Sequence, residues 1–297
     1  MSAPGRKQGR SPEAAPGAGR GDAGRGDAGQ GARRIETAIR AATASGRPAV
    51  AAFVTAGFPD RERFPGILDA VRRQADLVEV GVPFSDPMAD GVTIQRASHT
   101  ALLAGVTLAA ILETLAARRD DGAPLLLMSY LNPLLAFGID RLPAAARAAG
   151  VDGFIIPDLP HEEAGLLRPG CEAEGLALVS MVTPATPPDR LARLLAASRG
   201  FVYAVTRTGT TGGAVALEAP TRRYLERVRA ASPVPVLAGF GIRDARALRA
   251  LARSADGVVV GSALIESIER GDDPAAFLAA LRAGAARHPG ARAEARP

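Results

Sequence analysis

Short apolar runs alternate along most of the chain with longer segments in which apolar residues recur every three or four positions. The short runs are rich in Val, Leu and Ile, which is typical of buried parallel strands. The longer segments have one apolar stripe each, which is typical of helices that pack on one face. The eight predicted strands span residues 49–55, 76–82, 124–130, 152–158, 176–182, 201–206, 233–239 and 256–261. The clearest predicted helices span residues 107–120, 162–175, 188–198, 221–231 and 244–254.

The number and spacing of these elements favour one closed barrel. Most strands begin roughly 25 residues after the previous one, the length of one strand–helix unit. Eight such units match a (β/α)8 barrel of about 250 residues, and an open, doubly wound sheet is the main alternative. We prefer the barrel because the strand count is eight and glycine-rich loops follow the seventh and eighth strands. The expected fold is therefore an α/β (β/α)8 TIM barrel over residues 35–288, with an extra N-terminal helix, a disordered N-terminal tail (1–34) and a flexible C-terminal tail (289–297).

The positive charge of the chain is concentrated near its N-terminus. Residues 1–34 contain seven Lys and Arg against three Asp and Glu, whereas the rest of the chain contains 29 against 28. This Gly/Ala/Arg-rich segment has almost nothing to bury, so we predict that it is disordered. The nearly neutral remainder gives no support to nucleic-acid binding. A single cysteine, Cys171, and the lack of a membrane-length apolar run or a secretory signal pattern predict a cytoplasmic protein.

The most informative stretch is LVEVGVPFSDPMADGVTIQ, residues 77–95. It places Glu79 inside an apolar strand and then adds a loop with Asp86 and Asp90. A carboxyl group in a barrel strand is unfavourable unless it lies near the mouth, and Gly81 indicates that the strand is ending there. We therefore predict that Glu79 is functional, with a pKa raised by partial burial, as a group that gives and takes protons needs. Spacing alone does not choose between Asp86 and Asp90, since both also fit turn or helix-cap positions.

Glycine-rich loops follow the last three predicted strands. GTTGG at 209–213, GFG at 239–241 and GSA at 261–263 are individually weak signals, but together they match the phosphate site common in barrels. Backbone N–H groups can approach an anion at such loops because glycine has no Cβ, and the Ser262 hydroxyl could add a donor. We therefore predict a phosphate ester as substrate.

Lysine-imine and histidine–metal chemistries are both disfavoured. The only lysine, Lys7, lies in the predicted tail, so the barrel cannot form a Schiff base. The histidines, His99, His161 and His288, lack metal-ligand spacing and are expected at the surface, so no metal is predicted. Of the chemistries considered, the one that the sequence still favours is acid–base catalysis by carboxylates on a phosphorylated substrate.

These residues closely resemble the tryptophan synthase alpha chain family. The resemblance rests on EVGVPFSDPMADGVTIQ, PDLPHEEA, TPATPP, FVYAVTRTGTTG, AGFGI and VVGSALIESI, and it covers roughly residues 35–288. It implies a (β/α)8 lyase that cleaves indole-3-glycerol phosphate to indole and glyceraldehyde 3-phosphate in tryptophan biosynthesis. It also implies an α2β2 complex with a beta chain. Pyridoxal phosphate is implied only for that beta partner, and no cofactor is implied for this chain.

The resemblance also implies roles for individual residues. Glu79 corresponds to the family's proton-shuttling Glu, and Asp90 to the Asp that holds the indole nitrogen, which favours Asp90 over Asp86. The loop of residues 83–90 corresponds to one near the beta chain, and the loop of residues 207–213 to a mobile lid in which Thr210 replaces a commonly apolar residue. The residues that correspond to phosphate-binding positions are Gly212, Gly241, Gly261 and Ser262. Those that correspond to apolar residues around the indole are Phe53, Tyr203 and Phe240.

Three alternatives stay open from the sequence. The first is a stand-alone indole-3-glycerol-phosphate lyase without a beta partner. The second is a different phosphate-binding barrel, such as an isomerase. The third is an inactive barrel kept as an allosteric binding subunit, against which the intact pair of Glu79 and Asp90 argues. Indole release, measured with and without a beta chain, separates them.

Overall fold

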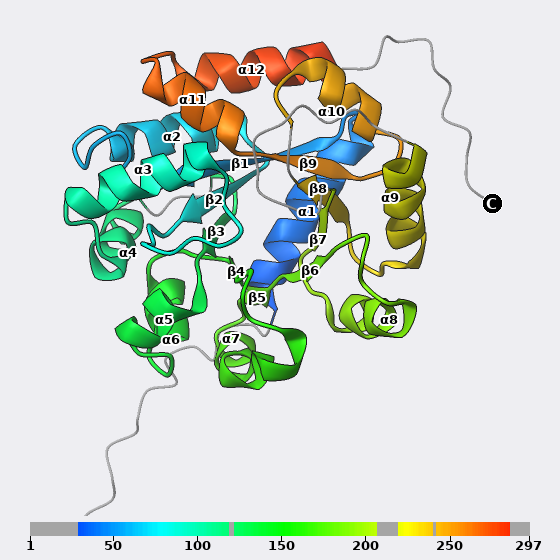
Figure 1. Ribbon diagram of the computed structural model, residues 1–297, viewed down its shortest axis with the longest axis horizontal. Helices are drawn as coiled ribbons and strands as arrows, with labels where there is room; N and C mark the ends of the chain where they lie inside the picture. Colours follow the sequence, from blue (N-terminus) through cyan, green and yellow to red (C-terminus); the bar gives the residue numbers. More distant parts are fainter. Residues whose placement is uncertain (1–28, 119–121, 207–218, 240–241, 286–297) are drawn as a thin grey trace, which may run out of the picture.

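The computed structural model describes residues 29–118, 122–206, 219–239 and 242–285, and it contains a ring of strands surrounded by helices (Figure 1). The strands are β1 (Ala49–Thr55), β2 (Leu77–Gly81), β3 (Leu125–Met128), β4 (Gly153–Ile155), β5 (Ala177–Leu178), β6 (Ser180–Val182), β7 (Val202–Val205), β8 (Val236–Gly239) and β9 (Gly257–Val260). The helices are α1 (Gln30–Ala44), α2 (Phe64–Gln74), α3 (Val92–Leu103), α4 (Leu108–Ala116), α5 (Leu131–Phe137), α6 (Leu142–Ala148), the 3-10 helix η1 (His161–Leu166), α7 (Arg168–Ala173), α8 (Pro188–Ala197), α9 (Ala219–Ala231), α10 (Ala245–Leu251), α11 (Ser262–Glu269) and α12 (Pro274–Ala285).

The ring of strands is completed by one continuous chain segment. All strand pairs are parallel, in the order β5–β4–β3–β2–β1–β9–β8–β7–β6. β5 pairs with β4 and β6 pairs with β7, and only Val179 separates β5 from β6. The N–H of Val179 donates to the Phe154 carbonyl at 2.9 Å. The predicted strand 176–182 is therefore present as two short strands, and the predicted α/β barrel is confirmed.

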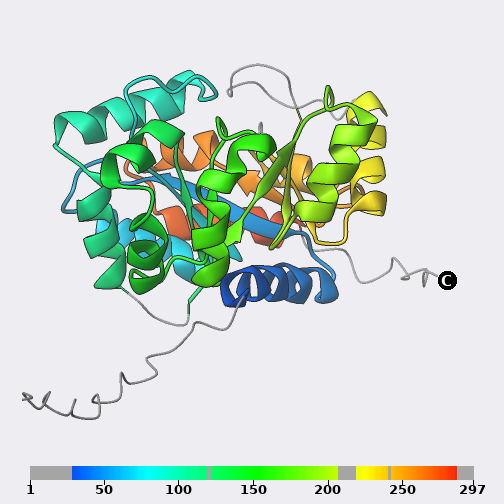
Figure 2. The ribbon, with the colours of Figure 1, turned by 90° about the horizontal axis from the view of Figure 1, so that it is seen from below.

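Helix α1 closes the amino-terminal end of the barrel (Figure 2). Ile35 and Ile39 are fully buried and belong to the cluster that fills the barrel interior. The Arg34 guanidinium donates to both oxygens of the buried Asp152 carboxylate at 2.9 Å. The predicted extra N-terminal helix is thus present, and it begins at Gln30, within the range assigned to the tail. With this end plugged, the opposite mouth is the open end of the barrel.

Some predicted helices differ in extent or kind. The predicted helix 162–175 is a 3-10 helix, η1, followed by α7. Pro169 has no N–H to donate and fits best in the first turn of a helix, so it starts α7 rather than continuing η1. No single helix among the described residues is long and apolar enough to cross a membrane, and α3 with α4 meets that criterion only as a pair bent by 91°. The predicted tail bounds stay predictions, because most of both tails lies outside the described residues.

Side chains alternate along the strands between the barrel interior and the surrounding helices. In β1, Ala49 and Ala51 pack in the interior cluster, whereas Val50 and Val54 pack against the helices. The interior layers are mainly aliphatic. Residues on the interior face at the carboxyl ends of the strands therefore line the open mouth, where barrel sites form.

Candidate active site

Glu79 lies in the middle of β2 with its side chain inside the barrel. Its register partners are Phe53 in β1 and Leu126 in β3. The side chain is fully buried, and neither carboxylate oxygen has a hydrogen-bond partner. This burial raises the pKa of Glu79 to about 8, because the ionised form would lose its hydration. At neutral pH Glu79 is therefore protonated and has a proton to give.

Asp90 ends the loop after β2, directly before α3. Burial raises the pKa of Asp90 to about 6, and a hydrogen bond from the Tyr130 hydroxyl acts in the opposite direction. The Tyr130 hydroxyl accepts from the Ala89 N–H at 2.9 Å, and its ring centroid lies 5.2 Å from that of Phe84. The Gln95 amide donates to the Asp90 carbonyl at 2.9 Å. These contacts fix the loop. Because its pKa is about 6, the Asp90 carboxylate is ionised at neutral pH.

Tyr203 connects the two acids in one site. It lies in β7, which is opposite β2 in the ring, and it is 3% exposed. Burial raises the pKa of Tyr203 well above its ordinary value, and the charges of Glu79 and Asp90, when these groups are ionised, raise it further. Both carboxyl groups therefore lie near enough to act on the same phenol. Asp86 is exposed, and its carboxylate accepts a hydrogen bond from the neighbouring Ser85 hydroxyl.

Two glycines make room for the aromatic rings of Phe53 and Tyr203. A Cβ at Gly81 would lie 2.4 Å from Cζ of Phe53, which is 8% exposed. A Cβ at Gly239 would lie 2.1 Å from Cε1 of Tyr203. Any larger residue at either position would displace a ring, and such overpacking is unfavourable. The sequence grouped Gly239 with the phosphate loops, whereas in the structure this glycine accommodates the Tyr203 ring.

The described part of the predicted phosphate site is the start of α11. Ser262 is the first residue of that helix, and Gly261 precedes it. The first N–H groups of a helix have no partner within it, so they can bind an anion. A Cβ at Gly261 would lie 3.6 Å from Cβ of Phe53, so the start of α11 lies beside the Phe53 side chain. Gly212, Gly241 and Phe240, and the predicted lid 207–213, lie outside the described residues.

Comparisons with known proteins identify the family of this chain. A profile of the family "Tryptophan synthase alpha chain" matches residues 39–289. The tryptophan synthase alpha chain of Chloroflexus aggregans is 47% identical over 229 residues, which cover 76% of this chain and 86% of the relative. That of Xylella fastidiosa is 46% identical over 260 residues, which cover 84% and 97%. A structure of Mycobacterium tuberculosis tryptophan synthase superposes with a TM-score of 0.80 at 36% identity, covering 86% of this chain and 99% of that chain. The chain belongs to the tryptophan synthase alpha chain family.

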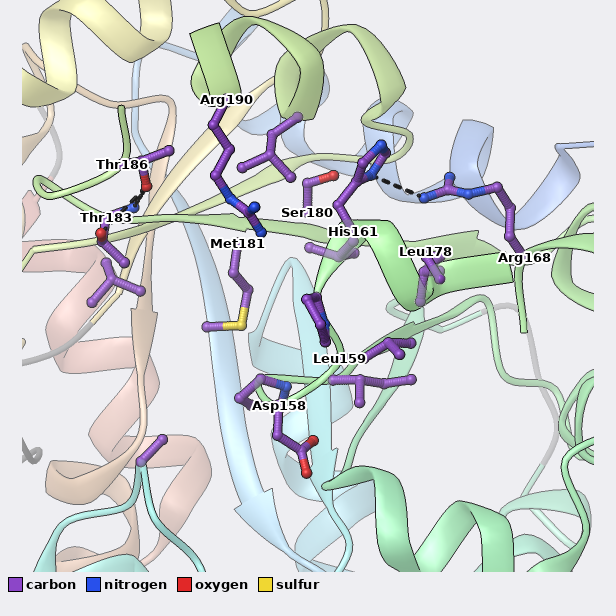
Figure 3. Close-up of a pocket in the computed structure, with 18 of the residues that line it drawn as sticks. Asp158, Leu159, His161, Arg168, Leu178, Ser180, Met181, Thr183, Thr186 and Arg190 are labelled. Carbon is purple, nitrogen blue, oxygen red and sulfur yellow. Dashed lines mark hydrogen bonds between the residues drawn. The ribbon is translucent and has the colours of Figure 1, made fainter. Parts of the chain in front are cut away.

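A cavity of about 660 Å³ opens at the mouth of the barrel, beside the carboxyl ends of β4 to β7 (Figure 3). The residues that line it include Met181, Val205, His161, Arg168 and Arg190. The Arg168 guanidinium and His161 Nδ1 lie 3.3 Å apart. The sequence placed His161 at the surface, and in the structure His161 is partly exposed and lines this cavity. His161 and Arg168 are close along the chain, whereas Arg190, Met181 and Val205 join them only through the folding of the barrel.

Tyr130 is the clearest residue of the site that the sequence did not reveal. It bonds to Asp90, and it lines a small cavity of about 10 Å³ together with Asp90 and Phe53. Its position was the available signal, because it ends the predicted strand 124–130 and site residues of barrels lie at strand carboxyl ends. Among the described residues no group of three or more His, Cys, Asp or Glu could hold a metal, and the absence of a metal stays a prediction.

Proposed function

We propose that this chain is a carbon–carbon lyase that cleaves indole-3-glycerol phosphate to indole and glyceraldehyde 3-phosphate. The observation that carries the proposal is a fully buried Glu79 carboxyl group without a hydrogen-bond partner inside the barrel, with Asp90 at the end of the loop that follows the same strand. The raised pKa values of both groups support it. This retro-aldol cleavage needs a proton donor at one part of the ring and a negative charge at another. Membership of the tryptophan synthase alpha chain family supports the choice of substrate.

Carbon 3 of the indole ring must be protonated before the side chain leaves, because an indole carbanion leaves poorly. Glu79 donates this proton, while ionised Asp90 accepts a hydrogen bond from the ring N–H and stabilises the positive charge. Ionised Glu79 then takes the proton of the hydroxyl next to the ring. The O–H electrons form the aldehyde C=O, and the electrons of the broken C–C bond restore the aromatic ring. Glu79 ends protonated, so the cycle needs no other proton source.

The far end of the substrate is proposed to bind at the late loops. Gly212, Gly241, Gly261 and Ser262 would hold the phosphate through backbone N–H groups and one hydroxyl. Phe53, Tyr203 and Phe240 would surround the indole. Binding at both ends orients the scissile bond, so remote binding energy contributes to the rate.

Indole release from indole-3-glycerol phosphate tests the two acids. Glu79→Gln should lower kcat by about 10²–10⁴-fold or more, with substrate affinity within a few fold of wild type. Asp90→Asn should lower kcat by about 10²–10⁴-fold, because it removes a positioned charge. Exposed Glu62 provides the control substitution Glu62→Gln, which should leave the rate unchanged. Wild-type turnover in Glu79→Gln would refute the proton shuttle.

The pH profile gives an independent test. Activity needs ionised Asp90 and protonated Glu79, with pKa values of about 6 and about 8. The profile of kcat/KM should therefore be a bell that falls below about pH 6 and above about pH 8. A profile that stays flat from pH 5 to pH 9 contradicts these protonation states.

We also propose that the chain is the alpha subunit of a cytoplasmic α2β2 tryptophan synthase, in which the beta chain alone holds pyridoxal phosphate. The family supports the partner, and the single lysine, Lys7, supports the absence of pyridoxal phosphate from this barrel. A stand-alone lyase is the alternative. Co-elution with a purified beta chain and faster indole release on its addition support the complex. Separate elution with an unchanged rate would favour the stand-alone lyase.

A further inference from the structure

Thr55 carries a buried hydroxyl group with no hydrogen-bond partner. It is the last residue of β1, its side chain is 1% exposed, and its Oγ1 atom makes no hydrogen bond. A hydroxyl that is buried without a partner is unfavourable, and most such groups in proteins find one. Such a hydroxyl can hydrogen-bond a ligand that binds beside it.

The pleat of β1 places Thr55 on the interior face of the barrel. Ala49 and Ala51 pack in the interior, and Phe53 pairs in register with the interior Glu79. Thr55 is two residues further along the same face, because side chains of a strand alternate with a period of two. It therefore lies one layer above Phe53 and Glu79, towards the mouth where a substrate enters.

The order of the strands places Thr55 between the two ends of the proposed site. β1 lies between β2 and β9 in the sheet. β2 and the loop after it carry the two acids, and Gly261 and Ser262 follow β9. A substrate that reaches from the acids to the phosphate loop must pass the carboxyl end of β1. The register partner of Thr55 on β2 is Gly81, which has no side chain, and the Phe53 ring lies beside that glycine.

The substrate has a polar group at this level that the proposed mechanism does not use. Two hydroxyl-bearing carbons link the indole ring to the phosphate, and Glu79 deprotonates only the hydroxyl next to the ring. We propose that the Thr55 hydroxyl hydrogen-bonds the second hydroxyl of the substrate, on the carbon between the reacting carbon and the phosphate-bearing carbon. Thr55 is then a specificity-determining residue. This inference rests on the proposed function.

The test compares two substrates in the full chain. One is indole-3-glycerol phosphate, and the other is 3-hydroxy-3-(indol-3-yl)propyl phosphate, which lacks only the second hydroxyl. Thr55→Val keeps the shape and removes the hydroxyl, and it should lower kcat/KM for the natural substrate by about 10- to 100-fold. On the deoxy substrate, wild type and Thr55→Val should differ by less than about threefold. Thr55→Ser, which keeps the hydroxyl, should retain discrimination between the two substrates.

A matched control is Thr114→Val, since that hydroxyl donates to the Ala110 carbonyl at 2.8 Å within α4. It should leave both rates near those of wild type. Equal slowing of both substrates by Thr55→Val would overturn the inference, because the hydroxyl would then act through Glu79 or the fold. A wild type that turns over both substrates equally would also overturn it, even if Thr55→Val does not fold. A wild type that releases no indole from the natural substrate overturns the proposed function first.

Discussion

The buried Glu79 should make the folded protein less stable as the pH rises. Its pKa is raised from 4.5 to about 8 by burial. The folded state therefore holds a proton that the unfolded state releases above about pH 4.5, and stability falls until the pH reaches about 8. Glu79→Gln removes this titration and keeps the shape of the side chain. As the pH rises from 5 to 8, Glu79→Gln should therefore lose less of its free energy of unfolding than the wild type does.

The magnitude follows from the pKa difference. Each pH unit between the unfolded and folded pKa values changes the free energy of unfolding by about 1.4 kcal/mol. Between pH 5 and pH 8 the wild type should lose about 4 kcal/mol relative to Glu79→Gln. A constant difference between the acid and the amide, such as their unequal hydrogen bonding, cancels because only the change with pH is compared.

Urea unfolding, followed by far-UV circular dichroism at pH 5 and pH 8, measures this change. Other carboxyl groups titrate alike in both proteins, so their contributions cancel. For the control Glu62→Gln, at an exposed position, the difference in free energy of unfolding from wild type should be the same at pH 5 and pH 8. If the difference between wild type and Glu79→Gln stays constant from pH 5 to pH 8, Glu79 is hydrated or paired in the folded protein, and the reasoning fails.

Three further predictions follow from single contacts. Tyr130→Phe removes the hydrogen bond that lowers the pKa of Asp90, so the acid limb of the kcat/KM profile should move to higher pH, and an unmoved limb would show that the bond is absent. Arg34→Met leaves the buried Asp152 carboxylate without its ion pair and should lower the free energy of unfolding by about 2 kcal/mol, measured in urea, since one-third of the Arg34 side chain is exposed. Gly239→Ala forces a Cβ into an aromatic ring and should destabilise the fold by about 1–3 kcal/mol, and an unchanged melting curve would contradict that packing.

Much of the fold could be predicted from the sequence because strand and helix patterns are local. Each predicted strand is present at its expected place: the first has its predicted bounds, and the others are shorter than predicted. The predicted strand 176–182 is divided because its first half pairs with β4 and its second half with β7. That division depends on how the ring closes, which no local pattern contains. The start of α7 next to Pro169 could have been anticipated, since proline favours the first turn of a helix.

The candidate site could be predicted only in part. Glu79 stood out because an acid in an apolar strand is rare, and the resemblance to a family chose Asp90 over Asp86. The role of Gly239 could not be predicted, because the ring that it accommodates comes from β7. Tyr130 belongs to no motif; its place at the end of a predicted strand was the one available signal, and its contact with Asp90 exists only after folding.

The sequence by itself determined a barrel of parallel strands and the acids that belong at its mouth. Hydrophobic periodicity and strand-end position depend on neighbours along the chain, so both can be read from the sequence. The position of Glu79 in its strand predicted the direction of its pKa shift, and only the tertiary structure decided how far burial raises that pKa. The pKa of Glu79 depends on an apolar layer assembled from strands far apart in sequence, and that layer exists only when the ring is closed.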